Sequence, residues 1–313
     1  MKALIVEVSV AIMLVNLMSA SAQIQYNVWV PTNGPLGGDV RHVTVYPSDP
    51  NRILANTQNG LFLTTNGGGR WTSVGQSVPS VRAILIAPTN PNNIFLATES
   101  GVFLSTNDGT TWGAISGIRL HSLVAGPQIS LWLYGGGDSG RVYVSSDRGM
   151  TWQLHNTHSQ WSVTALAIHP SNPNLIYAGT TGDFDFPGDG VFRSTDGGTS
   201  WSNTALPDKS ISSLVIDPSN PSVSYAGTRA GGMYPGSGVF KSTNSGSNWL
   251  SVGVGMPADS SVRALLLNPL LPLQVYAALE FDGLYKTENG GASWFHVNAN
   301  LDEGYVECLA SAP

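Results

Sequence analysis

The stretch that decides the fold is Ser145-Ser146-Asp147-Arg148-Gly149-Met150-Thr151-Trp152. Its pattern, Ser/Thr-x-Asp/Asn-x-Gly-x-x-Trp, starts again at Thr64, Ser105, Ser194, Ser242 and Thr287. Six copies of one motif in a single chain indicate internal repeats, and the repeat period has to be found before any single element is assigned.

Three short apolar runs accompany each motif. In the fourth unit they are Val163 to Ile168, Leu175 to Ala178 and Gly190 to Arg193, and the motif tryptophan begins a fourth. The first runs of the units start at residues 40, 81, 120, 163, 211, 262 and 306, so the period is 39 to 51 residues. Four strands in about 44 residues are typical of a β-propeller blade. The near-continuous apolar first runs predict innermost strands that are covered on both faces.

The two ends of the chain predict parts of a further blade. Tyr26 to Val30 resembles a fourth strand, and Tyr305 to Ala310 resembles a first strand. We therefore expect an all-β propeller with six complete four-stranded blades and the two ends of a seventh. Its curvature would be seven-bladed, with strands two and three of that blade missing through truncation at the carboxy terminus.

The amino terminus resembles an export signal. Lys2 precedes an apolar run from Val8 to Met18, and Ala20-Ser21-Ala22 supplies a small-residue cleavage site. The alternative is a membrane anchor, but Glu7 and Asn16 shorten the apolar stretch below the roughly 20 residues that a spanning helix needs. We expect a signal peptide at 1–22, one propeller domain at 23–313, and a secreted or periplasmic protein with no integral membrane segment after cleavage.

Composition narrows the choice of partner. The chain carries 14 Lys and Arg against 20 Asp and Glu, a net charge of −6, so it lacks the basic footprint of a nucleic-acid-binding protein. The single cysteine, Cys308, excludes an intrachain disulfide and a cysteine-cluster metal site. We expect no cofactor, no metal and a monomer.

The motif residues are expected to build a turn between the third and fourth strands. The Asp or Asn accepts backbone N–H groups, the hydroxyl closes the turn, and the tryptophan packs between blades. The alternative, catalysis or metal binding, is weaker because asparagine in four of the six copies is a poor general acid. The structural residues are Asn66, Trp71, Asn107, Trp112, Asp147, Trp152, Asp196, Trp201, Asn244, Trp249, Asn289 and Trp294.

These motifs resemble the Asp-box, or BNR, repeats of sialidases, two-propeller xyloglucanases, sortilin ectodomains and photosystem II assembly factors of the Ycf48 type. The resemblance covers residues 26 to 313. It implies a propeller fold and leaves the function open among hydrolysis and binding.

By analogy with propellers, binding groups are expected where the innermost strands begin. The second residues of the first runs are Arg41, Arg82, His121, Thr164, Ser212, Arg263 and Glu307. The arginines and His121 predict a polar mouth that grips a carboxylate or sulfate. The alternative is that the arginine stems only cover the tops of the blades.

Two long loops lie at the same expected end. One contains Asp183, Phe184, Asp185 and Phe186, and the other contains Arg229, Met233 and Tyr234. Long loops on one face of a repeat protein commonly form its binding surface, so Asp185, Arg229 and Tyr234 join the candidate ligand-binding residues. The alternative is that the aromatic side chains pack against their own loops.

Catalysis has weak support. A sialidase needs an Arg-Ile-Pro segment that the chain lacks, and the xyloglucanases place an aspartate where this chain has Gln58. The remaining catalytic candidates are two carboxylate pairs, Asp183 with Asp185 and Glu280 with Asp282. The sequence therefore favours a secreted, noncatalytic propeller that binds a protein or polysaccharide, and a xyloglucanase-like or sialidase-like glycoside hydrolase is the alternative.

Overall fold

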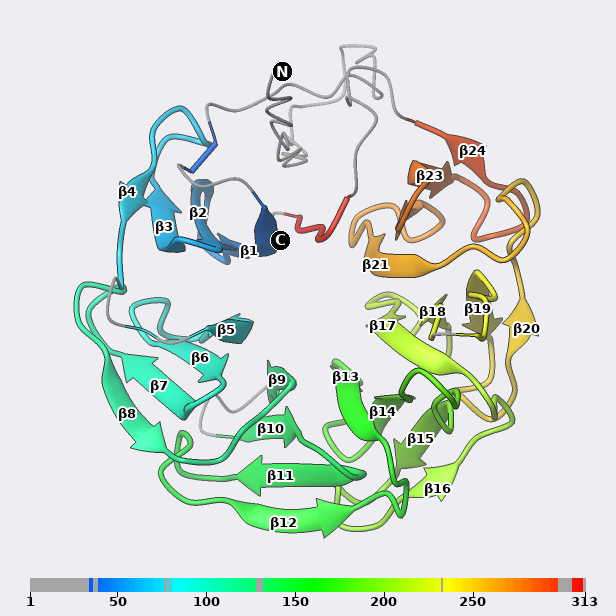
Figure 1. The fold of residues 1–313 in the computed structure, drawn as a ribbon, viewed down its shortest axis with the longest axis horizontal. Helices are drawn as coiled ribbons and strands as arrows, with labels where there is room; N and C mark the ends of the chain where they lie inside the picture. The colour runs from blue at the N-terminus through cyan, green and yellow to red at the C-terminus, as the bar shows by residue number, and fades with distance from the viewer. Residues whose placement is uncertain are drawn as a thin grey trace, which may run out of the picture.

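Six four-stranded sheets stand around a common axis in the computed structural model (Figure 1). The structure describes residues 34–35, 39–75, 78, 80–127, 132–231, 233–297 and 306–311. The expected signal peptide at 1–22 and the strand at Tyr26 to Val30 lie outside these residues. The described residues contain no helix that could cross a membrane.

Each sheet is one sequence repeat. Blade 1 holds β1 (Val40–Tyr46), β2 (Asp49–Thr57), β3 (Gly60–Thr64) and β4 (Thr72–Ser73). Blade 2 holds β5 (Val81–Ile86), β6 (Ile94–Thr98), β7 (Gly101–Ser105) and β8 (Gly113–Ser116). Blade 3 holds β9 (Ser122–Ala125), β10 (Leu133–Gly136), β11 (Arg141–Ser145) and β12 (Gln153–Asn156). Blade 4 holds β13 (Ser162–Ile168), β14 (Ile176–Thr181), β15 (Val191–Ser194) and β16 (Ser202–Asn203). Blade 5 holds β17 (Ser210–Ile216), β18 (Ser224–Arg229), β19 (Val239–Ser242) and β20 (Leu250–Ser251). Blade 6 holds β21 (Val262–Leu267), β22 (Val275–Leu279), β23 (Gly283–Thr287) and β24 (Phe295–His296).

The strands of a blade are hydrogen-bonded in chain order, and every pair is antiparallel. The first strand of each blade lies nearest the axis and the fourth lies at the rim (Figure 1). The prediction of an all-β propeller with six complete four-stranded blades is confirmed.

Two details of the predicted blades are wrong. The second strands, such as β6 and β22, are buried along their whole length, whereas the innermost strands are largely half-buried. A second strand has a strand on each side and a blade on each face, whereas an innermost strand turns one edge toward the axis. The fourth strands also begin one residue after the motif tryptophan, because that side chain turns into the interface between blades.

The core consists of layers between neighbouring blades. Each tryptophan packs in the apolar layer between its own blade and the preceding one, as Trp112 does beside Leu61 and Val74 of blade 1. Trp152, Trp201, Trp249 and Trp294 repeat this arrangement in the next four layers. Trp249 and Trp294 are 7% and 4% exposed, and the other four motif tryptophans are half-buried.

Residues 306–311 lie between the last blade and the first (Figure 1). Val306 and Leu309 pack on the core of blade 6, and Ala310 packs beside Trp71 and Val45 of blade 1. The Cys308 Sγ lies 3.5 Å from the Val40 carbonyl oxygen. The segment forms no strand, so the predicted first strand is not seen. The two ends of a seventh blade and the seven-bladed curvature stay predictions.

Candidate functional site

A cavity of about 520 Å³ opens at the end of the axis where the innermost strands begin. Its lining includes every one of the seven second residues picked out from the repeats. The lining residues, which we call the polar mouth, are Asp39, Arg41, His42, Arg82, His121, Thr164, Ser212, Arg229, Arg263 and Glu307.

An irregularity of the sheet lies at most of these positions. In five of the six blades the ladder between the first and second strands shifts register across the second residue, as it does between Val81 and Ala83 around Arg82. A β-bulge takes a residue out of the alternating pattern and redirects its side chain. The repeated bulge therefore accounts for five equivalent side chains at one cavity.

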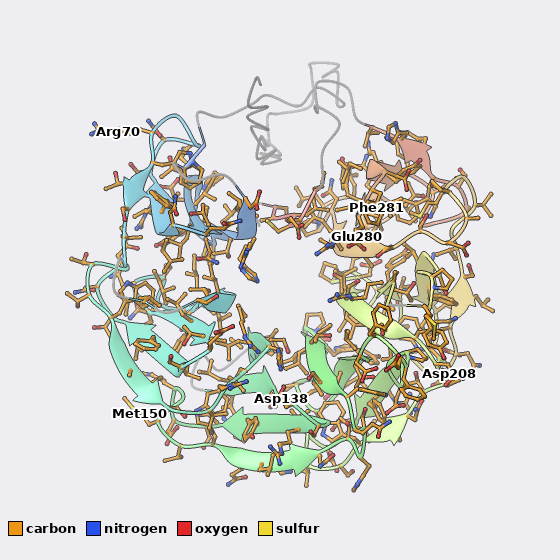
Figure 2. All side chains as sticks on the ribbon, in the orientation of Figure 1. Arg70, Asp138, Met150, Asp208, Glu280 and Phe281 are labelled. Carbon is orange, nitrogen blue, oxygen red and sulfur yellow. The ribbon has the colours of Figure 1, made fainter. Side chains whose placement is uncertain are left out.

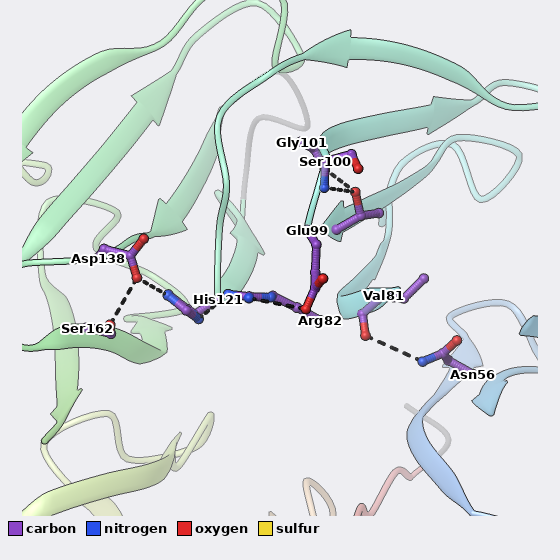
Figure 3. Close-up of polar contacts among 10 residues, drawn as sticks. Asn56, Val81, Arg82, Glu99, Ser100, Gly101, His121, Asp138 and Ser162 are labelled. Carbon is purple, nitrogen blue, oxygen red and sulfur yellow. Dashed lines mark hydrogen bonds and ion pairs between the residues drawn. The ribbon is translucent and has the colours of Figure 1, made fainter. Parts of the chain in front are cut away.

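Arg82 starts a chain of polar contacts that crosses two blade interfaces (Figure 3). Its Nη1 lies 2.9 Å from the His121 Nδ1, and the His121 Nε2 lies 2.6 Å from the Asp138 Oδ1. An arginine can only donate, so Nδ1 is the acceptor and Nε2 carries the proton donated to Asp138. Ser162 donates a further hydrogen bond to Asp138, at 3.2 Å.

These hydrogen bonds affect Asp138 and His121 in different ways. The hydrogen bond from His121 holds the pKa of Asp138 below its usual value, although partial burial opposes the effect. With one imidazole nitrogen accepting from a guanidinium and the other carrying a proton, His121 has no nitrogen free to act as a general base. Its arrangement suits the positioning of Arg82 better than proton transfer.

Arg263 is held from two sides. Its guanidinium lies 2.5 Å from the Glu280 Oε1 and 3.1 Å from the Glu307 Oε2, and Ser261 donates to the other Glu280 oxygen at 2.6 Å. Burial raises the pKa of Glu280, but the hydrogen bond from Ser261 and the charge of Arg263 outweigh it and leave the pKa below its usual value. Glu280 is therefore an ionised structural partner of Arg263.

Arg41 and Arg229 differ from Arg82 and Arg263. Both are exposed, and neither side chain forms a hydrogen bond or ion pair with another described residue. In blades 2 and 6 a glutamate directly follows the second strand. Its carboxylate forms an ion pair with the arginine of the same blade, Glu99 with Arg82 and Glu280 with Arg263. Gln58 takes that place in blade 1 and donates to Asp39 instead, at 2.6 Å. In blade 5 this position holds Arg229, and Ser212 stands where blades 2 and 6 have Arg82 and Arg263.

The remaining lining residues are neutral or engaged with the backbone. Thr164 and Ser212 donate to the carbonyl oxygens of Ile211 and Val262 in the following blades, at 2.9 and 2.6 Å. Burial, with a contribution from the Arg41 charge, lowers the pKa of His42 to about 4, and its Nδ1 is buried without a partner. His42 is therefore uncharged at neutral pH. Arg41 and Arg229 are the two arginines of the mouth whose side chains form no salt bridge with the described residues, although the charge of Arg229 helps to lower the pKa of Glu280.

The two long loops lie at the same end, and of the residues picked out from them only Arg229 lines the cavity. Met233 N donates to the Phe184 carbonyl at 3.4 Å, so the loops touch each other. Phe186 stacks on Trp161 with ring centroids 6.2 Å apart, which agrees with packing against the body of the protein. Of the predicted ligand-binding residues, Arg41, Arg82, His121, Arg229 and Arg263 come together at the polar mouth, and Asp185 and Tyr234 do not line it.

None of the four catalytic candidates lines the polar mouth. Asp183 Oδ1 accepts the backbone N–H groups of Asp185 and Phe186 at 3.0 Å each, so it closes its own loop. Glu280 is bound to Arg263, and neither Asp183, Asp185 nor Asp282 lines the polar mouth. No group of three or more His, Cys, Asp or Glu side chains among the described residues is arranged to hold a metal ion.

The motif residues lie far from this mouth, in the turns between the third and fourth strands. In all six turns the Ser or Thr hydroxyl donates to the Asp or Asn Oδ1 at 2.8 to 3.0 Å and accepts the N–H of the motif glycine at 2.8 to 3.0 Å. The Oδ1 also accepts the N–H four residues ahead at 2.9 Å. These bonds satisfy the turn locally.

Sequence reasoning missed the outer partners of the mouth. Asp138 and Glu99 bind its residues without lining the cavity, and Asp39 and His42 line it (Figure 2 labels Asp138 and Glu280). Glu99 and Glu280 share one repeat position, directly after the second strand, and that alignment was a usable signal. Asp138 takes the same repeat position in blade 3, since Gly136 pairs with Ser122 and Val142 as Ala97 pairs with Ala83 and Val102.

Comparison with known proteins supports the fold. No protein-family model matches the chain, and no curated protein matches it in sequence. Among solved structures, an ancestral GH74 enzyme is similar with 23% identity and a TM-score of 0.70 over 86% of this chain and 40% of that one. The GH74 xyloglucanase from Xanthomonas campestris has 17% identity and a TM-score of 0.64 over 83% of this chain and 45% of that one.

YCF48 bound to a D1 peptide is similar with 16% identity and a TM-score of 0.61 over 87% of this chain and 84% of that one. The chain thus spans less than half the length of the GH74 enzymes and most of the length of YCF48. At these identities the likeness shows the propeller fold alone.

Proposed function

We propose that this chain is a noncatalytic, secreted or periplasmic binding propeller that holds an acidic group of a protein partner at its polar mouth. The observation that carries the proposal is the pair Arg41 and Arg229. Both line a cavity of about 520 Å³ and neither has an acceptor among the described residues. Guanidinium groups bind carboxylates through charge-assisted hydrogen bonds, often two in parallel.

Exposed apolar side chains beside the mouth favour a protein over a polysaccharide. Phe184, Met233 and Phe281 are 69%, 71% and 72% exposed. They follow the second strands of three successive blades, and those strands end at the mouth. Aromatic residues, methionine and arginine are the side chains enriched in protein interfaces. An acidic residue flanked by apolar ones is the chemistry that this surface fits.

The comparisons are compatible with this proposal. One similar propeller, YCF48, was solved bound to a peptide. Because GH74 enzymes are also similar in fold, glycoside hydrolysis is the second candidate function. Against hydrolysis, the best carboxylate candidate, Glu280, is ionised and bound to Arg263, whereas glycosidases need one protonated carboxyl group near a second carboxylate.

Selection of phage-displayed heptapeptides on the immobilised protein tests the proposal. We expect enrichment of peptides with Asp or Glu next to aromatic or aliphatic residues. Binding of an enriched peptide should be lost in the Arg41→Ala/Arg229→Ala variant. The control is Arg70→Ala, which removes an exposed arginine at the outer rim (Figure 2).

A reducing-sugar assay on xyloglucan tests the second candidate. Release of sugar that stops in Glu280→Gln would establish hydrolysis and overturn the noncatalytic assignment. Peptide enrichment without acidic residues, or enrichment that is equal on the double variant, would overturn the acidic-partner assignment.

A further inference from the structure

Long cationic side chains fill the crevices between most blades on the side away from the polar mouth. Arg193 on β15 donates to the Ser245 carbonyl at 3.1 Å and to the Ser247 Oγ at 2.9 Å, in the motif turn of blade 5. Lys241 on β19 donates to the Gly290 carbonyl at 2.8 Å in the turn of blade 6. Arg52 reaches Asp108, the equivalent residue in the turn of blade 2.

The interface between blades 3 and 4 lacks such a side chain, as does that between blades 2 and 3, where the equivalent β7 residue is Leu104. The β11 residue equivalent to Arg193 and Lys241 is Val144, because Tyr134 faces Val144 in the ladder as Tyr177 faces Arg193. Valine is short and has no donor, so nothing from that position reaches the turn of blade 4. A pocket of about 310 Å³ fills the crevice instead, and Val144, Gly197 and Thr199 line it. Gly197 and Thr199 are the equivalents of the acceptors Ser245 and Ser247.

An aromatic platform forms one wall of this pocket. Trp132 is 39% exposed and stacks on the buried Tyr134, with ring centroids 6.4 Å apart and planes at 28°. The residues at the position of Trp132 in the other blades are Arg52, Asn93, Leu175, Val223 and Gln274. Among these six blades only blade 3 places an aromatic side chain there, and that side chain lines the pocket beside Val144.

Polar side chains complete the lining. Gln153, His155 and Asn174 line the pocket beside Trp132, and amide and imidazole groups both donate and accept hydrogen bonds. Asp196 also lines it, and its hydrogen bonds with Ser200 lower its pKa to about 2, so it is ionised at neutral pH. A fixed carboxylate disfavours an anionic ligand.

We infer that this pocket is a binding site for one neutral pyranose unit of a glycan. A pyranose ring offers a C–H face that packs on an aromatic ring and a rim of hydroxyl groups that pair with amide, imidazole and hydroxyl side chains. The pocket lies at the lower end of the size range of small-ligand sites, which suits a single sugar ring. It is independent of the polar mouth, since Gly126 and Pro173, which line it, follow the ends of β9 and β13, whereas the mouth lies where the innermost strands begin.

Calorimetric titration with neutral hexasaccharides of cellulose, xylan, mannan and amylose tests the site. At least one should bind with a dissociation constant below about 10 mM, and a galacturonic acid hexamer should bind more weakly. Trp132→Ala should weaken binding by about tenfold or more, while Trp132→Phe keeps an aromatic face and should stay within about threefold.

Val144→Lys is the second variant, since it places in blade 3 the residue that blade 5 carries. It should fill the crevice and abolish sugar binding while circular dichroism stays unchanged. The matched control is Phe184→Ala, which removes an exposed aromatic side chain at the other end. Absence of binding to all four hexasaccharides overturns the inference, and so does binding that survives both Trp132→Ala and Val144→Lys.

Discussion

A hydroxyl group and a carboxamide or carboxylate group hold each motif turn. The choice between Asp and Asn changes the charge and the direction of one hydrogen bond, because Asp147 and Asp196 accept from the hydroxyl four residues ahead, whereas Asn107 and Asn289 donate to it. Asp147 and Asp196 accept the same N–H bonds at the same distance as the four asparagines. The sequence alone predicted this role, because turn bonds are local and the motif repeats. The contact of Arg82 with His121 was out of reach because it joins residues 39 positions apart in neighbouring blades.

The two motif aspartates make stability depend on pH. Hydrogen bonds lower the pKa of Asp147 and Asp196 from 3.8 to about 2. A lowered folded-state pKa contributes stability that is present above about pH 4 and is lost as the pH falls toward 2. Asp147→Asn/Asp196→Asn should therefore flatten the decline of the free energy of unfolding between pH 4 and pH 2 in urea titrations. An unchanged pH profile in this double variant would contradict the assignment.

Burial separates the motif tryptophans. Trp294 is 4% exposed and its Nε1 donates to the Val252 carbonyl, so Trp294→Ala should lower the free energy of unfolding by about 3 to 5 kcal/mol. Trp201 is half-buried, so Trp201→Ala should have a smaller effect. Guanidinium-induced unfolding of both variants measures the difference, and equal losses would argue against the interface layers described above.

Strands one to three could be predicted from the sequence because glycines and prolines mark their ends. The inner bulges could not, since a bulge is a property of the pairing and not of one strand. The fourth strands were predicted one residue early because the tryptophan looks like a strand residue, whereas packing turns it between blades. The equivalence of the arginine positions, in contrast, was readable from the repeat alignment.

Two glycines that start third strands make a matched test at this scale. Gly60 and Gly101 have φ angles of 111° and 124°, a conformation that strains any other residue. A Cβ on Gly60 meets nothing within 4 Å, whereas a Cβ on Gly101 would lie 2.1 Å from the Ser116 carbonyl oxygen. Gly101→Ala should therefore lower the melting temperature well below that of Gly60→Ala in differential scanning calorimetry. Equal melting temperatures would show that the β7–β8 contact is not tight.

At the scale of the molecule, residues 306–311 connect blade 6 to blade 1 through apolar contacts and the Arg263 to Glu307 ion pair. A repeat array depends on contacts between neighbouring units, so deleting residues 306–313 should lower the melting temperature. Each kcal/mol lost corresponds to about 2 to 4 °C in a domain of this order of size.

Glu307→Gln is the control for this deletion, because it removes the ion pair and leaves the apolar contacts. Its effect should be small, since a half-exposed ion pair contributes about 1 kcal/mol or less. A deletion no more harmful than Glu307→Gln would contradict the connecting role of the segment.

The chain has a net charge of −6, but the polar mouth brings four arginines together. Two of them lack carboxylate partners among the described residues. The overall composition excluded nucleic acid but could not place this local charge. Alignment of the repeats predicted three of the four arginines at the mouth, and Arg229 was predicted from its position in a long loop.

The dissociation constant of a selected acidic heptapeptide, measured by calorimetry, tests the central claim most directly. A charge-assisted hydrogen bond lost from a binding site costs about 1.5 to 3 kcal/mol, which is roughly 10- to 150-fold in affinity. Arg41→Ala/Arg229→Ala should therefore bind the peptide at least about 100-fold more weakly than the wild-type protein. Arg70→Ala, with one rim charge removed, should bind it as the wild type does. Equal affinity of the wild type and the double variant would contradict an acidic-ligand site at the polar mouth.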